Sequence, residues 1–447
     1  MKISALVLAA GKGSRMESSI PKPMHKIAGY PMIDHVLNTL SRNDIKDIRV
    51  VVGPEMANLE SHIQKYNNDI SIMVQNDRLG TADAVKVGIV EPHDDVLVLF
   101  ADTPFIKSTT IRKMYELLYQ NQEQNAVVIA GFIAKDPASY GRLVVDSNDH
   151  LKEIVEFLDC DEAQKQIGLC NSGIMFINHK HASMLLNKIK NNNSKKEFYL
   201  TDIVSIAHSE NLACKYITID ESEAIAVNSR SELHQAEKLI QEQLRDKFIN
   251  NGVTLIDKST VYFSVDTKID KDVVIYPNVF IGAGVEIGGR TEIRSFSHIE
   301  KAKIGSNNII GPFARIRPGT NTADSVVIGN FVEVKNSAIQ EHTKVNHLSY
   351  VGDAYIGKRV NVGAGTITCN YDGYNKHITR ILDETFIGSN VCLIAPVSVG
   401  KGSIIAAGSV ITADVGSDDL AIARVEQRNF VNKASYIRQR KNYNKDS

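Results

Sequence analysis

Hydrophobic residues in the second half of the chain recur with a period of six. Isoleucine stands at every sixth position, and a small or β-branched residue stands two positions before each one: Ile269, Ile275, Ile281, Ile287, Ile293 and Ile299, with Thr267, Val273, Val279, Val285, Thr291 and Ser297. This period fits neither a helix nor an ordinary strand. Coils built from six-residue repeats turn the same side chains inward and stack, so the pattern predicts a parallel β-helix. The alternative is a β-sandwich with a chance run of β-branched residues.

The repeat is interrupted in two places. Its register slips by one residue at Ile304, and residues 318–325 and 368–384 break it with stretches rich in Gly, Asn, Asp and Thr. The register then recovers fully at Ile387, Leu393, Val399, Ile405 and Ile411. We predict that both interruptions are loops that leave the coil, and such insertions often carry the binding surface of a repeat protein.

The first half alternates short apolar runs with helical patterns. Residues 5–10, 48–53 and 96–100 are apolar runs of strand length, and residues 32–40 have helical spacing. The opening run is short for a secretory signal and leads directly into a Gly-rich turn, so it is interpreted as a buried strand. This alternation predicts βα units and a mostly parallel, Rossmann-like sheet.

A helical arm is predicted between the halves. Residues 229–250 carry apolar side chains at helical spacing: Leu233, Ala236, Ile240, Leu244 and Phe248. Ser229 and Glu232 have the form of a capping box, and Gly252 lies just past the predicted end. The predicted organisation is an α/β domain at 1–228, a helical linker arm at 229–250, a β-helix domain at 251–433 and a basic tail at 434–447.

The basic tail carries Arg438, Arg440, Lys441 and Lys445. We predict that it is frayed, with a position near an anionic ligand as the alternative.

Composition narrows the class of protein. The chain has 447 residues, of which 43% are hydrophobic, and a formal net charge of -1. It therefore has material for two or three cores and no global attraction to nucleic acid or anionic lipid. Five cysteines without CxxC spacing argue against a disulfide framework or a zinc site and favour a reducing cytosol. No run approaches the roughly 20 apolar residues that span a membrane.

The first apolar run ends in a Gly-rich turn with cations after it. The turn reads Leu8-Ala9-Ala10-Gly11-Lys12-Gly13-Ser14-Arg15-Met16, and Lys22 follows. Glycines at a strand-to-helix turn let backbone N–H groups approach phosphate oxygens, while Arg15 and Lys22 supply positive charge. The spacing matches neither a Walker A loop nor the dinucleotide-binding fingerprint. Gly-Lys-Gly alone is equally compatible with a plain turn, and the two cations favour a phosphate-binding loop.

This loop, with Pro21-Lys22 beyond it, resembles the signature of sugar-phosphate nucleotidyltransferases. Further motifs of that family follow in order: Val74-Gln75 with Leu79-Gly80-Thr81, Ala101-Asp102-Thr103-Pro104, Tyr140-Gly141-Arg142, Val155-Glu156, Asn171-Ser172-Gly173 and Val227-Asn228. With the hexapeptide repeats, they resemble the bifunctional family that joins N-acetylglucosamine-1-phosphate uridylyltransferase to glucosamine-1-phosphate N-acetyltransferase in bacterial cell-envelope synthesis. The resemblance implies a Rossmann-like nucleotidyltransferase domain and a left-handed β-helix acetyltransferase domain.

A magnesium site is expected in the first half. In uridylyl transfer the sugar phosphate attacks the α-phosphorus of UTP and pyrophosphate leaves, so phosphate charge must be neutralised. Mg²⁺ keeps most of its waters and needs one or two protein oxygens, and Asp102 follows an apolar strand where it can supply one. The plain alternative is a turn residue ahead of Thr103-Pro104. The resemblance adds Asn228 as the second metal ligand.

The resemblance also implies the substrate contacts of this half. UTP and UDP-N-acetylglucosamine are expected at Leu8, Ala9, Ala10, Gly11, Arg15, Lys22, Gln75, Gly80, Thr81, Gly141, Glu156, Asn171 and Asn228. Gln75 is expected to face uracil, because an amide offers a donor and an acceptor to an imide edge. Gly141, Glu156 and Asn171 are expected to face the sugar. Two residues depart from the family: Ala101 where glycine is usual, and Pro23 where an aliphatic residue is usual.

The β-helix half carries a histidine among cations. Asn346-His347-Leu348-Ser349-Tyr350 is preceded by Glu333-Val334-Lys335 and Arg315-Ile316-Arg317-Pro318-Gly319. Three cations and a titratable base on adjacent coils suit an anionic substrate such as a phosphorylated amino sugar. A histidine among turns is by itself more often structural, and the neighbouring cations favour the catalytic interpretation.

The resemblance implies direct acetyl transfer with His347 as general base for the glucosamine amine. Glucosamine 1-phosphate is expected at Arg317, Lys335, Tyr350, Asn361 and Lys376. Acetyl-CoA is expected at Ala364, Asn370, Tyr371, Ser389, Ala407 and Arg424. A direct transfer needs no acyl-enzyme, so Cys369 and Cys392 are interpreted as packing residues.

The resemblance further implies a homotrimer that acetylates first and transfers uridylyl second, and the cysteine pattern favours a cytoplasmic location. Its expected partners are small molecules: UTP, acetyl-CoA, glucosamine 1-phosphate and N-acetylglucosamine 1-phosphate, with no nucleic acid and no membrane. One alternative is a single-activity nucleotidyltransferase with a structural or regulatory β-helix, against which the group around His347 argues. Another is a non-enzymatic scaffold, against which the presence of Arg15, Lys22, Asp102 and Asn228 argues.

Overall fold

The computed structural model describes residues 2–89, 93–120, 125–137, 140–147 and 149–443. The chain divides into two compact units, Met1–Glu242 and Gln243–Ser447. Met1 and tail residues 444–447, with the predicted basic residue Lys445, lie outside the described residues.

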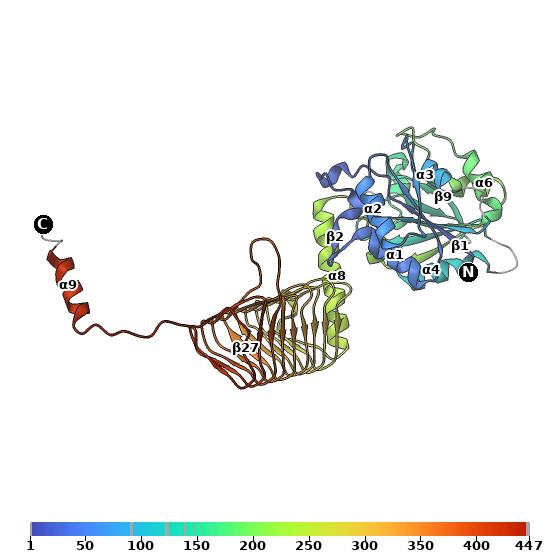
Figure 1. The fold of residues 1–447 in the computed structure, drawn as a ribbon. Coiled ribbons are helices and arrows are strands. Elements are labelled where there is room, and N and C mark those ends of the chain that lie inside the picture. The colour runs from blue at the N-terminus through green and yellow to red at the C-terminus, as the bar shows by residue number, and fades with distance from the viewer. Residues whose placement is uncertain (1, 90–92, 121–124, 138–139, 148, 444–447) are drawn as a thin grey trace. The chain divides into compact units, whose positions relative to one another are not determined.

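The first unit is an α/β domain built on a mixed sheet (Figure 1) with the strand order β11-β7-β10-β6-β1-β4-β5. Its strands are β1 (Ile3–Leu8), β4 (Asp47–Val52), β5 (Ser71–Val74), β6 (Asp95–Phe100), β7 (Val127–Ile133), β10 (Leu169–Ile177) and β11 (Cys214–Ile219), with β8 (Arg142–Val145) and β9 (Leu151–Val155) at the side and the hairpin β2 (Lys26–Ile27) and β3 (Tyr30–Pro31). β1, β4, β5 and β6 are parallel, as the alternation predicts, whereas β10 runs antiparallel to β6 and β7.

Helices cover both faces of this sheet. They are α1 (Met32–Arg42), α2 (Ala57–Tyr66), α3 (Thr81–Gly88), α4 (Ser108–Leu118), α5 (Glu162–Lys165), α6 (His179–Lys188) and α7 (Ile203–Ser209). The buried side chains of β1 alternate, because Ala5 and Val7 pack with α1, α2 and α4 while Leu6 and Leu8 pack with α3, α6 and α7. The opening apolar run is thus a central buried strand, as predicted. Leu8 of β1 pairs with Phe100 of β6, so the segments that follow these strands leave the sheet at one edge.

The predicted linker is the helix α8 (Arg230–Asn250), and the boundary between the two compact units falls within it. At its start the Glu232 backbone N–H donates to Ser229 Oγ at 3.2 Å, as in a capping box, while the Glu232 carboxylate accepts from the Asn228 N–H at 2.6 Å. At its end Gly252 has φ +90°, and the N–H of Val253 donates to the Phe248 carbonyl at 3.0 Å. The sequence signals at both ends of this helix are therefore confirmed.

The second unit is a left-handed parallel β-helix whose stacked coils form three sheets in the described residues (Figure 1). The first sheet contains β12 (Thr254–Leu255), β15 (Val274–Ile275), β18 (Glu292–Ile293), β21 (Ile309–Ile310), β24 (Val327–Asn330), β27 (Lys344–His347), β30 (Asn361–Val362), β33 (Phe386–Ile387), β36 (Ile404–Ile405) and β38 (Leu420–Ala421). The second contains β13 (Tyr262–Phe263), β16 (Phe280–Ile281), β19 (His298–Ile299), β22 (Arg315–Ile316), β25 (Glu333–Lys335), β28 (Tyr350–Gly352), β31 (Ile367–Cys369), β34 (Cys392–Ile394) and β37 (Val410–Ile411). The third contains β14 (Lys268–Ile269), β17 (Glu286–Ile287), β20 (Lys303–Ile304), β23 (Asn321–Thr322), β26 (Ala338–Ile339), β29 (Ala354–Ile356), β32 (Thr379–Ile381) and β35 (Val397–Val399).

The six-residue period marks the interior of this coil. Every residue of the double register that predicted the fold is buried except Ile269, which is partly buried. The slip at Ile304 also has a structural counterpart, because Ile304 pairs with Ile287, 17 positions earlier, whereas Ile287 pairs with Ile269 at 18. Coils of two lengths therefore stack without disturbing the inward side chains.

One predicted loop is wrong. Residues 318–325 do not leave the coil, because β23 lies within them and pairs with strands on both sides. Thr320 and Thr322 take the inward positions and are buried. Thr322 pairs with Ile304 and Ile339, so it stands where the register has isoleucine. Threonine has the branched shape of valine and fills this position, although it lacks the hydrophobicity by which the isoleucine register was recognised.

The second predicted loop is shorter than predicted. Strand β31 runs to Cys369 and β32 begins at Thr379, so the residues between these two strands are those that project from the coil. The insertion lengthens the coil, since Asn361 pairs with Phe386, 25 positions later.

The C-terminal segment departs from the prediction of a frayed tail. It contains the helix α9 (Lys433–Tyr443), whose Lys, Arg and Gln residues are good helix formers uninterrupted by Gly or Pro. The described side chains from Ile422 to Arg440 are all exposed. Across the described residues, every helix is too short or too polar to cross a membrane.

Candidate active sites

The Gly-rich loop brings Lys22 to the edge of the sheet where β1 and β6 end. Gly13 has φ +63°, and a Cβ there would lie 2.9 Å from Lys22 Cβ, so a glycine lets the loop fold over Lys22. Arg15 lies in the short helix η1 (Ser14–Met16) and is exposed. Lys22 begins η2 (Lys22–Met24) and turns its ammonium toward Asp102, which follows β6.

Two adjoining cavities lie at this edge. The first, of about 290 Å³, is lined by predicted nucleotide residues: Leu8, Ala9, Ala10, Gly11, Lys22, Gln75, Gly80 and Thr81. The second, of about 240 Å³, is lined by the predicted sugar residues Gly141, Glu156 and Asn171. Thr81, Phe100 and Asp102 line both cavities. The residues predicted for the two substrates therefore meet at Asp102. The two departures from the family, Ala101 and Pro23, line the first cavity.

Lys22 contacts both predicted metal ligands. Its Nζ forms an ion pair with the Asp102 carboxylate and lies 3.1 Å from Asn228 Oδ1. The Val227 N–H donates to the Asp102 carbonyl at 2.9 Å, which holds the start of α8 against the end of β6. A carboxylate and an amide oxygen that share one cation fit the ligand set of a magnesium ion that retains several waters. Groups of three or more His, Cys, Asp or Glu suited to a metal are absent from the described residues.

Gln75 is oriented by protein acceptors. Its amide nitrogen donates to the Gly80 carbonyl at 3.0 Å and to Asp83 Oδ2 at 2.7 Å. The Gln75 amide oxygen therefore remains free to accept a hydrogen bond from a ligand, for example from the N–H of an imide. Gly80 has φ +129°, and a Cβ there would lie 2.5 Å from the Phe198 carbonyl oxygen, so this wall of the cavity requires glycine.

The sugar-side cavity contains a partly buried acid, Glu156. Burial raises the pKa of the Glu156 carboxyl, and a hydrogen bond from Thr201 Oγ1 at 3.2 Å opposes that rise. Asn171 Oδ1 accepts from the Gly173 N–H at 2.9 Å, which leaves its NH₂ group as a donor. The Asn171 N–H donates to the Gly141 carbonyl at 2.8 Å. The three predicted sugar residues thus surround one space with both donors and acceptors.

Several lining residues were not predicted from the sequence. Arg78 lines the nucleotide cavity, and Thr201 lines the sugar cavity beside Glu156. Arg78 lies within the Gln75–Thr81 motif, so a third cation near the nucleotide, besides Arg15 and Lys22, could have been found there. Thr201 lies far from any motif, and its place is set by packing of the segment before α7 against α3.

In the second unit His347 is paired with an amide. Its Nδ1 lies 2.8 Å from Asn330 Oδ1, and the two residues are opposite each other on β27 and β24. An amide oxygen accepts, so Nδ1 carries the hydrogen and Nε2 of the neutral ring keeps a lone pair. His347 is exposed, which leaves the ring accessible to a substrate.

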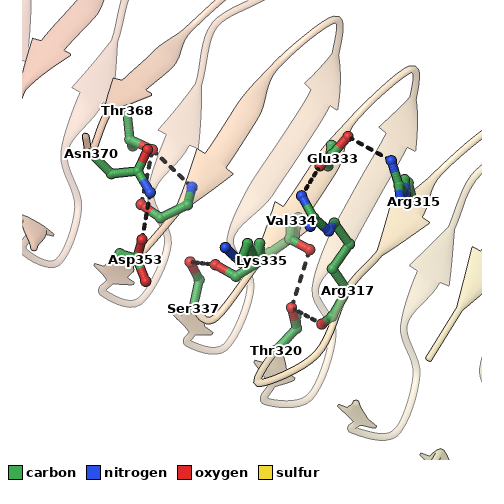
Figure 2. Close-up of polar contacts among 11 residues, drawn as sticks. Arg315, Arg317, Thr320, Glu333, Val334, Lys335, Ser337, Asp353, Thr368 and Asn370 are labelled. Atoms are coloured by element: carbon green, nitrogen blue, oxygen red, sulfur yellow. Dashed lines mark hydrogen bonds and ion pairs between the residues drawn. The ribbon is translucent and has the colours of Figure 1, made fainter. Parts of the chain in front are cut away.

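Two of the predicted phosphate-binding cations, Arg317 and Lys335, lie at adjacent strands of the second sheet (Figure 2), and the third, Lys376, lies close to Lys335. Repulsion, first from Lys376 and then from Arg317, lowers the pKa of Lys335. Arg317 donates to Glu333 at 2.7 Å, and Arg315 lies 3.7 Å from the other oxygen of the same carboxylate. Lys335 and Lys376 are like charges held close together, and such a pair is suited to an anionic ligand. Glu333 is part of a motif noted in the sequence, yet its place between the two arginines depends on coil register.

The projecting loop is fixed at its base. The Asn370 amide, which is buried, donates to the Asp353 carboxylate, and Asn336 donates to the same carboxylate. Within the loop Tyr371 pairs with Lys376, and Asp372 accepts from two backbone N–H groups and from His377. These hydrogen bonds, the first from the Asn375 N–H, lower the pKa of Asp372. Lys376 is thus held above the coil beside Lys335, while the buried Asn370 is a structural anchor.

A column along successive coils is formed by four residues predicted for acetyl-CoA: Ala364, Ser389, Ala407 and Arg424. The Ala364 carbonyl accepts from the Asn390 N–H at 2.7 Å, and the Ser389 carbonyl accepts from the Gly408 N–H at 2.8 Å. Arg424 donates to the Ala407 carbonyl. Tyr350 pairs in register with Glu333, and Asn361 pairs with Lys344. The small residues predicted for acetyl-CoA therefore follow one another down the coil, with an arginine at the end.

Comparison with known proteins matches both units. The family model of the MobA-like NTP transferase domain matches residues 5–164, and that of the hexapeptide repeat of succinyl-transferase matches residues 378–413. Three curated relatives carry the name bifunctional protein GlmU. The protein of Paramagnetospirillum magneticum is 46% identical over 95% of this chain and 94% of its own length. The Bartonella quintana protein is 45% identical over 95% of this chain and 94% of its own length. The Zymomonas mobilis protein is 44% identical over 98% of both chains.

Among solved structures, a putative glucose-1-phosphate thymidylyltransferase from Bacillus anthracis is similar to 53% of this chain. Its sequence is 22% identical, 94% of that chain is covered, and the TM-score is 0.44.

Proposed function

Because the chain belongs to the family of bifunctional GlmU proteins, we propose that it makes UDP-N-acetylglucosamine in two transfers. The second unit moves acetyl from acetyl-CoA to the amine of glucosamine 1-phosphate. The first unit then moves uridylyl from UTP to N-acetylglucosamine 1-phosphate and releases pyrophosphate. The chain is an enzyme with a nucleotidyltransferase half and a hexapeptide-repeat half, and the identity of the substrates is the proposal.

The observation that carries the uridylyl half is that two cavities meet at Asp102. UTP occupies the first, with uracil against the Gln75 amide oxygen, and the sugar occupies the second between Glu156 and Asn171. The sugar phosphate oxygen then attacks the α-phosphorus in line with the leaving pyrophosphate. Lys22 and Arg15 neutralise the triphosphate. Asp102 and Asn228 would hold Mg²⁺, and the bound ion would neutralise charge that develops on the phosphates.

The observation that carries the acetyl half is the cation cluster together with the His347–Asn330 pair. Arg317, Lys335 and Lys376 bind the phosphate of glucosamine 1-phosphate. His347 Nε2 takes a proton from the amine as its nitrogen attacks the thioester carbon, and coenzyme A leaves as the thiolate. The coenzyme lies along the column from Ala364 to Arg424. Direct transfer requires no acyl-cysteine.

We also propose that the protein assembles as a homotrimer through its β-helix. Phe296, Phe313 and Phe331 stack at one corner of successive coils with ring centroids 4.9 and 5.1 Å apart, and Leu348 follows. Each of these side chains is at least 44% exposed, and each residue has a φ between 52° and 61°, which is unfavourable for bulky residues. This apolar edge, adjacent in sequence to Asn330 and His347, supports contact between copies. Light scattering checks for a mass three times 49.3 kDa.

The substrates and the thiol state support a location in the cytoplasm. UTP and acetyl-CoA are cytoplasmic metabolites, and all five cysteines are free thiols in the structure. Localisation of a tagged chain in its host checks this proposal.

A coupled assay tests the function directly. The purified protein is given glucosamine 1-phosphate, acetyl-CoA, UTP and Mg²⁺, and free thiol and pyrophosphate are followed separately. Release of both products is expected. Pyrophosphate that forms only when N-acetylglucosamine 1-phosphate is supplied, with no thiol, would contradict the acetyl half.

A further inference from the structure

Lys22 occupies the space between the two oxygens that we propose as metal ligands. Its ammonium contacts the Asp102 carboxylate and lies 3.1 Å from Asn228 Oδ1. The side chains of Lys22 and Asp102 are each 14% exposed, so solvent screens their attraction only in part. One cation of the protein itself is therefore the counter-ion of this oxygen pair.

The three groups are anchored independently. The Gly13 turn packs on Lys22, Asp102 follows the central strand β6, and Asn228 precedes α8 with its N–H bonded to Glu232 at 2.6 Å. The contact between the Lys22 ammonium and the two oxygens is therefore fixed by the protein itself. A divalent ion that takes the same oxygens meets a tethered cation already held there, and the two positive charges repel each other.

We propose that Lys22 keeps the metal ligands closed in the nucleotide-free protein and releases them when a triphosphate binds. This inference rests on the proposed uridylyl transfer. Lys22 lines the nucleotide cavity, where the anionic oxygens of a triphosphate offer its ammonium a second acceptor. Once the ammonium pairs with phosphate, Asp102 and Asn228 are available to the metal. Nucleotide and metal thus bind with positive coupling, and Lys22 is the positioning residue that produces it.

The consequence is that removal of this cation strengthens metal binding. Mn²⁺ serves as the probe, because it takes the same oxygen ligands as Mg²⁺ and its free aquo ion is counted by electron paramagnetic resonance. In the full-length, nucleotide-free protein, Lys22→Met is expected to bind Mn²⁺ about 10-fold more tightly than the wild type, the factor that corresponds to one ion-pair-assisted bond. UTP binding measured in EDTA is expected to weaken by a similar factor in the same variant. Changes of opposite sign separate this role from a structural one, since a damaged site loses both ligands.

Two variants act as controls. Lys22→Arg keeps a cation and is expected to bind Mn²⁺ within about 3-fold of the wild type. Lys12→Met removes the same charge from an exposed position of the same loop. Because solvent screens this distant charge, the Mn²⁺ affinity of Lys12→Met is expected to stay within about 3-fold of the wild type. Circular dichroism confirms that each variant is folded.

Mn²⁺ affinity in Lys22→Met that equals the wild-type or Lys12→Met value overturns the inference while leaving the proposed function intact. Failure of every variant to bind Mn²⁺, with or without UTP, overturns the inference together with the proposed metal site.

Discussion

Nδ1 of His347 lies 2.8 Å from Oδ1 of Asn330 on the preceding coil. The amide fixes both the tautomer and the orientation of the imidazole, so that Nε2 is presented as a base. We expect Asn330→Ala to lower the kcat of acetyl transfer about 10-fold, a part of the 10²- to 10⁴-fold that a general base contributes. Uridylyl transfer in the same protein is the internal control. An unchanged acetyl rate in Asn330→Ala would show that the ring needs no such support.

The two halves are expected to fail separately. His347→Ala should reduce acetyl transfer by at least about 10²-fold and spare uridylyl transfer, because it removes the proposed base, which lies in the second unit. Asp102→Ala should do the reverse, because it removes the proposed metal carboxylate. Thiol release is measured with glucosamine 1-phosphate and acetyl-CoA, and pyrophosphate release with UTP and N-acetylglucosamine 1-phosphate supplied directly, on each folded variant. Loss of both activities from either substitution would contradict the model of two sites.

The β-helix was predictable because its period of six directly encodes which residues face inward. The prediction failed at 318–325, where Thr320 and Thr322 fill inward positions with a polar β-branched side chain. Hydrophobicity was the wrong measure there, since shape decides which residues fit a narrow coil. In the first unit the parallel strands followed from the alternation of apolar runs. The antiparallel β10 did not, because strand order depends on pairings between distant segments.

The site residues were also predictable only in part. Lys22 and Asp102 belong to recognisable motifs, yet their contact depends on β1 and β6 ending at the same edge. The pairing of Arg317 with Glu333 depends on whether the intervening coil has 17 or 18 residues, which one inserted residue changes. Motifs therefore indicate which groups act, while the fold decides which partners hold them.

The cation cluster should act mainly on substrate binding. Lys335→Met removes one of three charges proposed to bind the phosphate, and hydrogen bonds between charged groups are stronger than those between neutral ones. We expect the KM for glucosamine 1-phosphate to rise about 10- to 100-fold with a smaller change in kcat, measured by thiol release. Lys303→Met, an exposed lysine on the third sheet, is the control and should leave this KM unchanged. A fall in kcat without a change in KM would argue against phosphate binding by Lys335.

The cysteines of the β-helix should be dispensable for catalysis. Burial raises the pKa of the Cys369 thiol, which disfavours the thiolate that an acyl-enzyme would need. We expect Cys369→Ala combined with Cys392→Ala to retain acetyl transfer within about 3-fold, since a direct attack by the amine uses neither thiol. The rate of thiol release and a mass spectrum of the protein incubated with acetyl-CoA measure this. An acetylated cysteine in the native protein that turns over on addition of glucosamine 1-phosphate would overturn direct transfer.

Glu156 should make the stability of the first unit depend on pH. Burial raises the pKa of its carboxyl, so the folded state binds this proton more tightly than the unfolded state. The folded protein is therefore favoured below the unfolded pKa, and that advantage is lost as pH rises through the higher folded pKa. Glutamine keeps the hydrogen bond with Thr201 and carries no charge, so Glu156→Gln should gain stability relative to the wild type as pH rises from the unfolded pKa to the folded pKa of Glu156. Urea unfolding of both proteins from pH 4 to pH 8 checks the difference. A difference in unfolding free energy between the two proteins that does not change with pH would show that ionisation of Glu156 does not destabilise the folded state.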